Sequence, residues 1–140
     1  MSQERARPDA NNCFVCGPDN PIGLHLTFRM DGTVCRSEFT PDQCHVGFDG
    51  MTHGGILYSA LDDAMANWLF LQGARGYTAR CEVRYLEPLD IGVEVYLEGR
   101  LERRKARLAK LVARAVRAHD GKTVAQAQAS FMIESPGQLL

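Results

Sequence analysis

The chain has 140 residues, of which 45% are hydrophobic and 24% are charged, a composition typical of a single globular domain with a real core. Its formal net charge of −1 gives no electrostatic case for nucleic-acid binding, and no apolar run approaches the roughly 20 residues of a membrane span. Residues 1–10 lack the apolar core of a secretory signal, so we expect a cytoplasmic protein.

Three segments are expected along the chain. They are a disordered N-terminal leader over residues 1–12, a single domain over residues 13–135 and a C-terminal tail over residues 136–140. No internal repeat or low-complexity tract divides the central segment, so we expect one core.

The five cysteines raise the question of a metal site. Cys13-Phe-Val-Cys16-Gly17 has the shape of one half of a zinc knuckle, but a structural zinc site needs four ligands, and only Cys44-His45 could supply the second half. The odd number of cysteines argues against a disulfide framework. We therefore interpret them as reduced, packed or loop thiols and expect no metal and no cofactor. A zinc-bearing interaction module is the alternative, which metal analysis would test.

Turn residues and alternation define the first half of the chain. Residues 17–23 are dense in turn formers, residues 24–30 alternate as a strand, and Asp31-Gly32 signals a hairpin to a second strand over residues 34–39. Residues 41–52 form a glycine-bearing connection without a clear period. Their length and position make them a candidate binding loop.

From Gly54 the hydrophobic period becomes that of a helix, which Gly73 ends. Asp62 and Asp63 sit in this helix, on or beside its apolar face, where a carboxylate is costly unless it is paired or functional. Free N–H groups at the helix start favour developing negative charge. One element thus offers an oxyanion site and a candidate base or nucleophile, which acyl transfer needs.

Four strands are expected after the helix, over residues 77–86, 93–101, 108–117 and 123–133. Residues 108–117 also have helical propensity. However, Asp120-Gly121 signals a hairpin turn, and the strictly alternating residues 123–133 need a partner strand, which residues 108–117 supply. The order of elements predicts an α+β fold, in which a mainly antiparallel sheet surrounds one central helix.

These motifs together resemble the hotdog-fold acyl-CoA thioesterases, in the branch that includes the phenylacetate-pathway type. His53 opens a His-Gly-Gly, and Asp62 follows nine positions after it, which is the helix motif of that family. Residues 13–24, 46–52 and 84–89 resemble the opening, the lead-in loop and the proline-terminated strand of such proteins. The resemblance covers roughly residues 13–134. It implies a hotdog fold, with about six strands wrapped round one long central helix, in dimers that often form tetramers.

The resemblance also implies roles for individual residues. Asp62 would act as general base or nucleophile, the backbone N–H of Gly54 would polarise the thioester carbonyl, His53 would orient the loop and substrate, and Thr78 would help to orient water. Asp62 and Gly54 are eight residues apart, about 12 Å along a helix at 1.5 Å per residue. One subunit therefore cannot supply both to one site, and Asp62 of one chain must meet Gly54 of the other. Asp63, turned by about 100° from Asp62, is expected to be structural or solvated.

Substrate contacts are expected from the loop before the helix and from basic residues on the next strand. The candidate substrate-binding residues are Gly47, Phe48, Asp49, Gly55, Arg80 and Arg84. Arginines suit the phosphates of CoA, although a basic run is also typical of a solvated face. Gly47 stands where related enzymes often carry Asn or Gln.

The sequence thus predicts a hydrolase that converts an acyl-CoA thioester to the free acid and CoA. We expect it to work as a homodimer or a dimer of dimers, without a nucleic-acid or membrane partner. The alternative is a non-catalytic hotdog dimer that binds an acyl or aromatic ligand, which the departure at Gly47 favours. A hotdog hydratase or dehydratase is the least favoured alternative, because the sequence lacks the paired Asp and His that this branch carries on a different loop.

Overall fold

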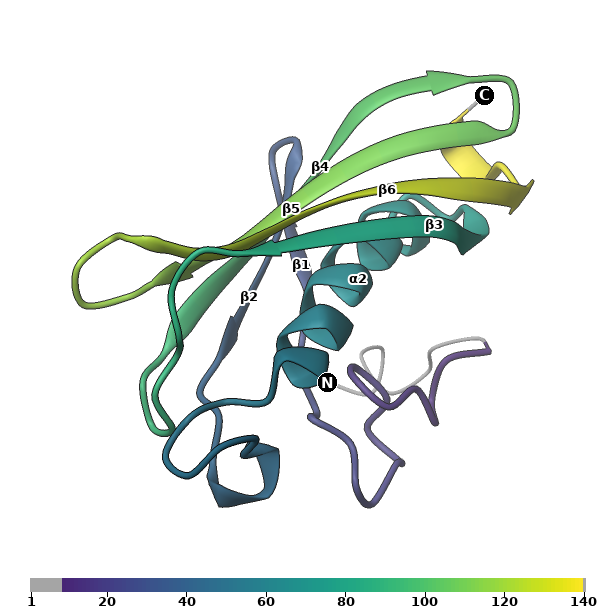
Figure 1. Ribbon diagram of the computed structural model, residues 1–140. Coiled ribbons are helices and arrows are strands. Elements are labelled where there is room, and N and C mark those ends of the chain that lie inside the picture. Colours follow the sequence, from purple (N-terminus) through teal and green to yellow (C-terminus); the bar gives the residue numbers. More distant parts are fainter. Residues whose placement is uncertain (1–8, 140) are drawn as a thin grey trace.

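A six-stranded antiparallel sheet curves over one long helix in the computed structural model, which describes residues 9–139 (Figure 1). The strands lie in the order β1-β2-β4-β5-β6-β3, so β1 and β3 form the two edges. The elements are β1 (Arg29–Asp31), β2 (Val34–Phe39), η1 (Gln43–His45), α2 (Gly54–Phe70), β3 (Arg75–Tyr85), β4 (Val95–Lys105), β5 (Leu108–Arg117), β6 (Thr123–Ser135) and η2 (Gly137–Leu139). This architecture confirms the predicted α+β fold.

Helix α2 packs against the concave face of the sheet. Its Leu61 and Met65 are fully buried, as are Leu97 of β4 and Phe131 of β6, whose side chains alternate inward along their strands. Full burial of each such side chain contributes about 1.5–3 kcal/mol. The helix lies close to β4 at Gly99, where an added Cβ would lie 2.6 Å from the Ala64 carbonyl oxygen. Glycine is therefore required there for the helix to sit on the sheet.

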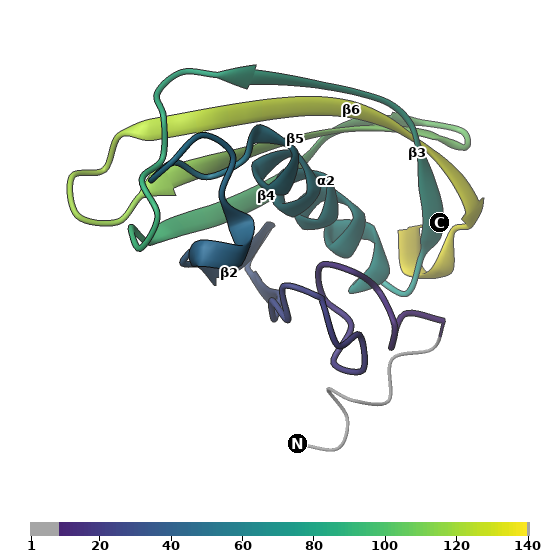
Figure 2. The ribbon, with the colours of Figure 1, turned by 60° about the horizontal axis from the view of Figure 1, so that its bottom comes forward.

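The segment 9–28 covers the side of α2 that faces away from the sheet (Figure 2). Val15, Cys16, Leu26 and Phe28 of this segment are buried in the same core as the helix. The helix therefore has apolar neighbours on two opposite sides. Asp63 lies in the helix at the level of this covering segment.

The strand predicted over residues 24–30 is wrong in its first part, because only its last two residues belong to β1. His25 adopts a left-handed φ of 56°, which breaks an extended strand. The backbone N–H groups of Leu24 and Leu26 bond to the carbonyls of Phe14 and Val15 rather than to β2. The alternating burial is nevertheless present, because Leu26 and Phe28 both face the core.

The later strands are present at or close to their predicted bounds, and β5 matches its prediction over residues 108–117. Strand β4 runs four residues past its predicted end at 101 and carries a register shift between Leu101 and Arg103. No helix in the described part of the chain is long and apolar enough to cross a membrane.

Most of the leader predicted over residues 1–12 lies outside the described residues. Residues 9–12 form turns, and the Asn11 carbonyl accepts a hydrogen bond from Asp19 N. Within the predicted tail over residues 136–140, residues 137–139 form η2, and residue 140 lies outside the described part.

Candidate functional site

His53 caps the N-terminus of α2 and leaves one donor of the first turn without an acceptor. Its Nδ1 accepts a hydrogen bond from Gly55 N at 2.8 Å, and its carbonyl accepts from Ile56 N at 3.0 Å. Within residues 9–139, the N–H of Gly54 donates to no acceptor. This N–H lies at the positive end of the helix dipole, where a developing oxyanion is stabilised. Of the two predicted glycines, Gly54 is therefore the one with an available donor.

Tyr85, at the end of β3, lies directly against Gly54. Its hydroxyl donates to the Gly54 carbonyl at 2.8 Å, and an added Cβ on Gly54 would lie 3.3 Å from the ring carbon Cζ. The tyrosine ring is half exposed. Tyr85 is not among the site residues predicted from the sequence, although it lies in the motif over residues 84–89 that carries part of the family resemblance.

Asp62 and Thr78 form the other half of the candidate site. The Thr78 hydroxyl donates to Asp62 Oδ1 at 2.7 Å, which joins α2 to β3. Both side chains are half-buried. Burial raises the pKa of Asp62 above its ordinary value, and the hydrogen bond from Thr78 offsets part of that rise. A carboxylate held in this way can accept a proton.

A bulge in β3 determines which side chains share the face of Thr78. The pairing with β6 shifts between Thr78 and Arg80, so the residue between them is extra. After the shift, Cys81 and Tyr85 lie on the helix side, and Arg80 and Arg84 are exposed on the other side. Strict alternation from Thr78 would have placed the two arginines toward the helix.

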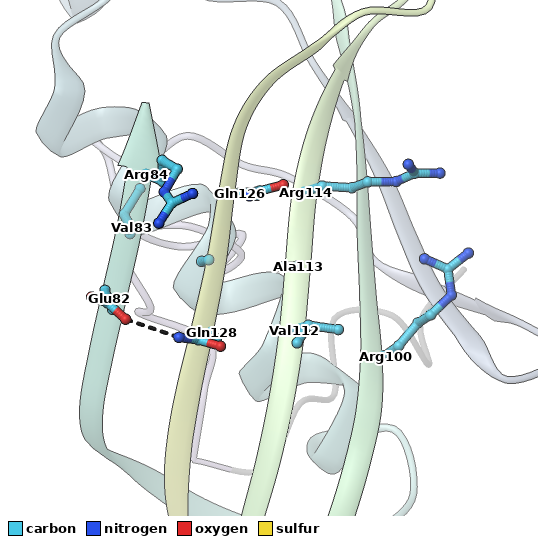
Figure 3. A pocket seen from close by; sticks show the side chains of 10 residues that line it. Glu82, Val83, Arg84, Arg100, Val112, Ala113, Arg114, Gln126 and Gln128 are labelled. Atoms are coloured by element: carbon cyan, nitrogen blue, oxygen red, sulfur yellow. Dashed lines mark hydrogen bonds between the residues drawn. The ribbon is translucent and has the colours of Figure 1, made fainter. Parts of the chain in front are cut away.

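The exposed arginines border hollows on the outer face of the sheet. Arg84 lines one of about 500 Å³ together with Arg100 and Arg114 (Figure 3), and Arg80 lines a second. Neither hollow includes Asp62, which lies beneath the sheet. Within one subunit, the structure therefore does not bring Arg80 and Arg84 together with the carboxylate.

The loop before the helix forms a small hairpin that leans on the cap residue. Gly47 N bonds to the Met51 carbonyl at 2.8 Å, and an added Cβ on Gly47 would lie 3.1 Å from the Cα of His53. Phe48, at the tip, is 84% exposed, and Asp49 beside it is also exposed. Gly47 is therefore placed beside His53, with Phe48 and Asp49 projecting into solvent.

Asp63 is half-buried and bonded to two partners, so of the two expectations for it, structural or solvated, the structural one fits better. Its Oδ2 accepts from Asn67 Nδ2 at 2.8 Å, and its Oδ1 lies 3.6 Å from Cys13 Sγ, which donates to it. Burial raises the pKa of Asp63 to about 7. The two adjacent aspartates therefore face different partners, Asp62 toward β3 and Asp63 toward the N-terminal segment.

The described residues hold one group of side chains suited to a metal ion, and it includes only the first of the two half-knuckles that the zinc alternative would need. Cys13, Cys16 and Asp63 have ligand atoms within 4.8 Å of one another. Cys44 and His45 lie in η1 and are not part of this group. There, the His45 ring accepts from Asp42 N at 2.9 Å.

Comparisons with known proteins identify the family and the fold. The family model of the thioesterase superfamily matches residues 49–124. A phenylacetic acid degradation-related protein from Ralstonia eutropha superposes with a TM-score of 0.69 at 27% identity, over 78% of this chain and 85% of that one. The Escherichia coli PaaI protein, from the phenylacetic acid degradation operon, gives a TM-score of 0.72 at 21% identity, over 78% and 83%.

A hypothetical thioesterase protein from Streptococcus pneumoniae, solved with coenzyme A, gives a TM-score of 0.74 at 14% identity, over 79% of this chain and 90% of that one. Two further structures of that protein carry alanine in place of an aspartate and of a threonine, respectively. No curated protein matches the chain in sequence.

Proposed function

Because this chain belongs to the thioesterase superfamily, we propose that it hydrolyses an acyl-CoA thioester to the free acid and CoA. Asp62 acts as the general base or nucleophile, and the Gly54 N–H of the partner subunit donates to the oxyanion. The observation that carries the proposal is the pairing of Asp62 with Thr78 at 2.7 Å, together with the available donor at Gly54. These are the two groups that acyl transfer needs.

The chemistry assigns a step to each group. Asp62 removes a proton from water as the water oxygen bonds to the thioester carbonyl carbon, or its own carboxylate makes that bond first. Negative charge then develops on the carbonyl oxygen, where the Gly54 N–H stabilises it. Collapse of the tetrahedral intermediate breaks the C–S bond, and CoA leaves as a thiolate that takes up a proton. When water attacks, this step gives the free acid; when the Asp62 carboxylate attacks, it leaves a mixed anhydride on Asp62, which water then hydrolyses to the free acid and the regenerated carboxylate. Thr78 orients Asp62 throughout.

The need for a partner subunit follows from the positions of Asp62 and Gly54 on α2. Asp62 and Gly54 are separated by about 12 Å along the helix axis, whereas both must approach one carbonyl within roughly 3 Å. Strand β3 is an edge strand of 11 residues, and its free edge offers unpaired backbone groups to another chain. Pairing of two β3 edges would place each α2 beside the partner's sheet. We propose a homodimer of this kind, which can pair further into a tetramer.

Substrate contacts are proposed on the same basis. The acyl group would lie near exposed aromatic side chains at the seam between α2 and β3, where Tyr58 donates to the Cys81 carbonyl at 3.3 Å. Gly47, Phe48 and Asp49 would border the thioester from the hairpin before α2, with Gly55 beside them. Since β3 is an edge strand, Arg80 and Arg84 would lie at the rim of a dimer seam, where CoA phosphates can reach them.

A non-catalytic binding protein is the second candidate, and Gly47 favours it. Related enzymes often carry Asn or Gln at this position, whereas Gly47 offers no side chain to hold the thioester or water. Such a protein would bind CoA esters without releasing CoA.

Thiol release from acetyl-, hexanoyl-, lauroyl-, benzoyl- and phenylacetyl-CoA tests the proposal. The wild-type protein is expected to hydrolyse at least one of them, and Asp62→Ala is expected to lower kcat by about 10² or more. Asp19→Asn, at an exposed loop carboxylate, is the matched control and should leave the rate unchanged. Binding of CoA esters without turnover would support the second candidate, and an unchanged rate in Asp62→Ala would exclude the assigned role.

A further inference from the structure

The Cys-x-x-Cys turn near the N-terminus faces the side of α2 that the catalytic proposal does not use. The segment 9–28 crosses the helix opposite the sheet (Figures 1 and 2), and its Cys13 and Cys16 meet Asp63. The two sulfur atoms and a carboxylate oxygen lie within 4.8 Å of one another. Residues 50 positions apart in sequence thus supply the donors to one point.

The spacing of the donor atoms is close to that of a tetrahedral metal site. With Zn–S of about 2.3 Å and Zn–O of about 2.0–2.2 Å, neighbouring donors around a tetrahedral ion lie roughly 3.5–3.8 Å apart. Cys13 Sγ and Asp63 Oδ1 are already 3.6 Å apart. Every other pair in the group must close by no more than about 1 Å, which rotation of a cysteine side chain can provide.

The backbone of the turn is built to hold both thiols on one side. Gly17 N bonds to the Cys13 carbonyl at 2.9 Å, and Cys16 N points at Cys13 Sγ at 3.5 Å. An added Cβ on Gly17 would lie 2.3 Å from Cys13 N, so the turn requires glycine at this position. Backbone N–H groups directed at a sulfur favour its thiolate form, which is the form that binds metal.

Asn67 fixes the carboxylate from the other side. It lies one helical turn after Asp63 and donates to Asp63 Oδ2 at 2.8 Å, while Oδ1 faces Cys13. Asn67 is 2% exposed, and Cys16 is 6% exposed. No Lys, Arg or His in the described residues forms an ion pair with Asp63. The group therefore combines a half-buried carboxylate with two thiols, and no basic side chain of the described residues neutralises it.

We propose that Cys13, Cys16 and Asp63 bind one divalent cation of the zinc class, with water at the fourth position and Asn67 orienting the carboxylate. Two thiolates select a soft or borderline ion over Mg²⁺ or Ca²⁺. The second half of the site comes from α2 rather than from Cys44-His45. The ion anchors the N-terminal segment to the helix, so the site is structural and independent of the hydrolysis proposed for Asp62.

Titration of the reduced, metal-free protein with Co²⁺ tests this proposal. We expect saturable binding of one equivalent with a thiolate-to-cobalt charge-transfer band in the near ultraviolet, and a rise in the unfolding midpoint when Zn²⁺ is added. In Cys13→Ser the charge-transfer band should have about half of its wild-type intensity, because one of the two thiolates is gone. Asn67→Ala should weaken binding by about 10–100-fold, as loss of an orienting partner does. Cys44→Ser, at an exposed cysteine outside the group, is the control and should bind as the wild type does.

Absence of a saturable band in the folded, reduced wild-type protein would overturn the proposal without any variant. A band that Cys13→Ser leaves unchanged, or that Cys44→Ser removes, would overturn the assignment of ligands. Since none of these readouts depends on thioester hydrolysis, failure here and failure of the proposed activity are separate results.

Discussion

The Thr78 hydroxyl on β3 donates to Asp62 Oδ1 on α2 at 2.7 Å, and this contact ties the edge strand to the central helix at the candidate catalytic carboxylate. The bulge that follows Thr78 lets this hydroxyl and the later Tyr85 face the helix on the same strand. The arrangement makes Thr78 a positioning residue in the proposed mechanism.

Thr78→Val removes the hydroxyl but keeps the shape of the side chain. A hydrogen bond to a charged group contributes about 1.5–3 kcal/mol, so we expect kcat to fall roughly 10–100-fold with little change in KM. Thr78→Ser should retain most of the rate, because it keeps the donor. Steady-state thiol release measures both variants. A loss of rate in Thr78→Ser without one in Thr78→Val would show that packing of the methyl group, rather than the hydrogen bond, matters.

Gly54→Pro tests the oxyanion donor alone. Gly54 is the first residue of α2, a position that proline tolerates, and His53 has the extended ψ of 133° that suits a residue before proline. Since proline lacks the N–H, kcat should fall by about 10²–10³. Gly54→Ala brings a similar Cβ contact with Tyr85 but keeps the N–H, so it should lose much less activity. The role assigned to Gly54 would be wrong if alanine and proline were equally harmful.

Thr52→Val is expected to stabilise the protein. Thr52 is 9% exposed, and within residues 9–139 its hydroxyl has no hydrogen-bond partner. An unsatisfied buried hydroxyl costs about 1–3 kcal/mol, so its removal at constant shape should raise the free energy of unfolding by about 1 kcal/mol. Urea unfolding measures the change, with Thr52→Ser as the variant that keeps the hydroxyl. A destabilised Thr52→Val would show that the hydroxyl bonds to water or to a partner subunit.

Ionisation of Glu98 should make the stability of the folded protein depend on pH in the acid range. Burial alone would raise its pKa, but hydrogen bonds from Arg114 and Arg36, both at 2.7 Å, outweigh burial and lower the pKa below its usual value. A carboxyl group whose pKa is lowered by folding stabilises the folded state at pH values above its pKa in the unfolded chain, which is about 4.3. This stabilisation is lost as the pH falls through the pKa of the group in the folded state. Glu98→Gln should flatten the acid side of the curve of unfolding midpoint against pH.

Glu102→Gln changes an exposed glutamate on the same strand and serves as the control for Glu98. It should leave the shape of that curve unchanged. If Glu98→Gln also left the curve unchanged, the ion pairs of Glu98 on the outer face would not contribute to stability.

The sequence predicted the fold well where one local pattern dominates. The helical period of α2, the turn at Asp120-Gly121 and the alternation of β6 each specify a local structure, and all three are present. The strand predicted over residues 24–28 is wrong because their alternation reflects burial of Leu26 and Phe28 in the core rather than pairing in the sheet. Their backbone partners, Phe14 and Val15, cannot be identified from alternation.

The site was predictable only in part, because an irregular strand and distant contacts decide the rest. The contact between Asp62 and Thr78 follows from the family spacing, although their roles remain predictions. The bulge after Thr78 inverts the faces of the following residues, and no turn former marks it, so alternation could not show that Arg80 and Arg84 lie on the face of the sheet opposite to Thr78. The meeting of Cys13 with Asp63 depends on tertiary packing.

Mixing two inactive variants tests most directly whether one active site is shared between two subunits. Asp62→Asn and Gly54→Pro are purified separately, dissociated, mixed in equal amounts and reassociated. A mixed dimer has one site with both Asp62 and Gly54 intact, so thiol release should recover to about a quarter of the wild-type rate. No recovery in a mixture shown to contain mixed dimers would contradict the shared site.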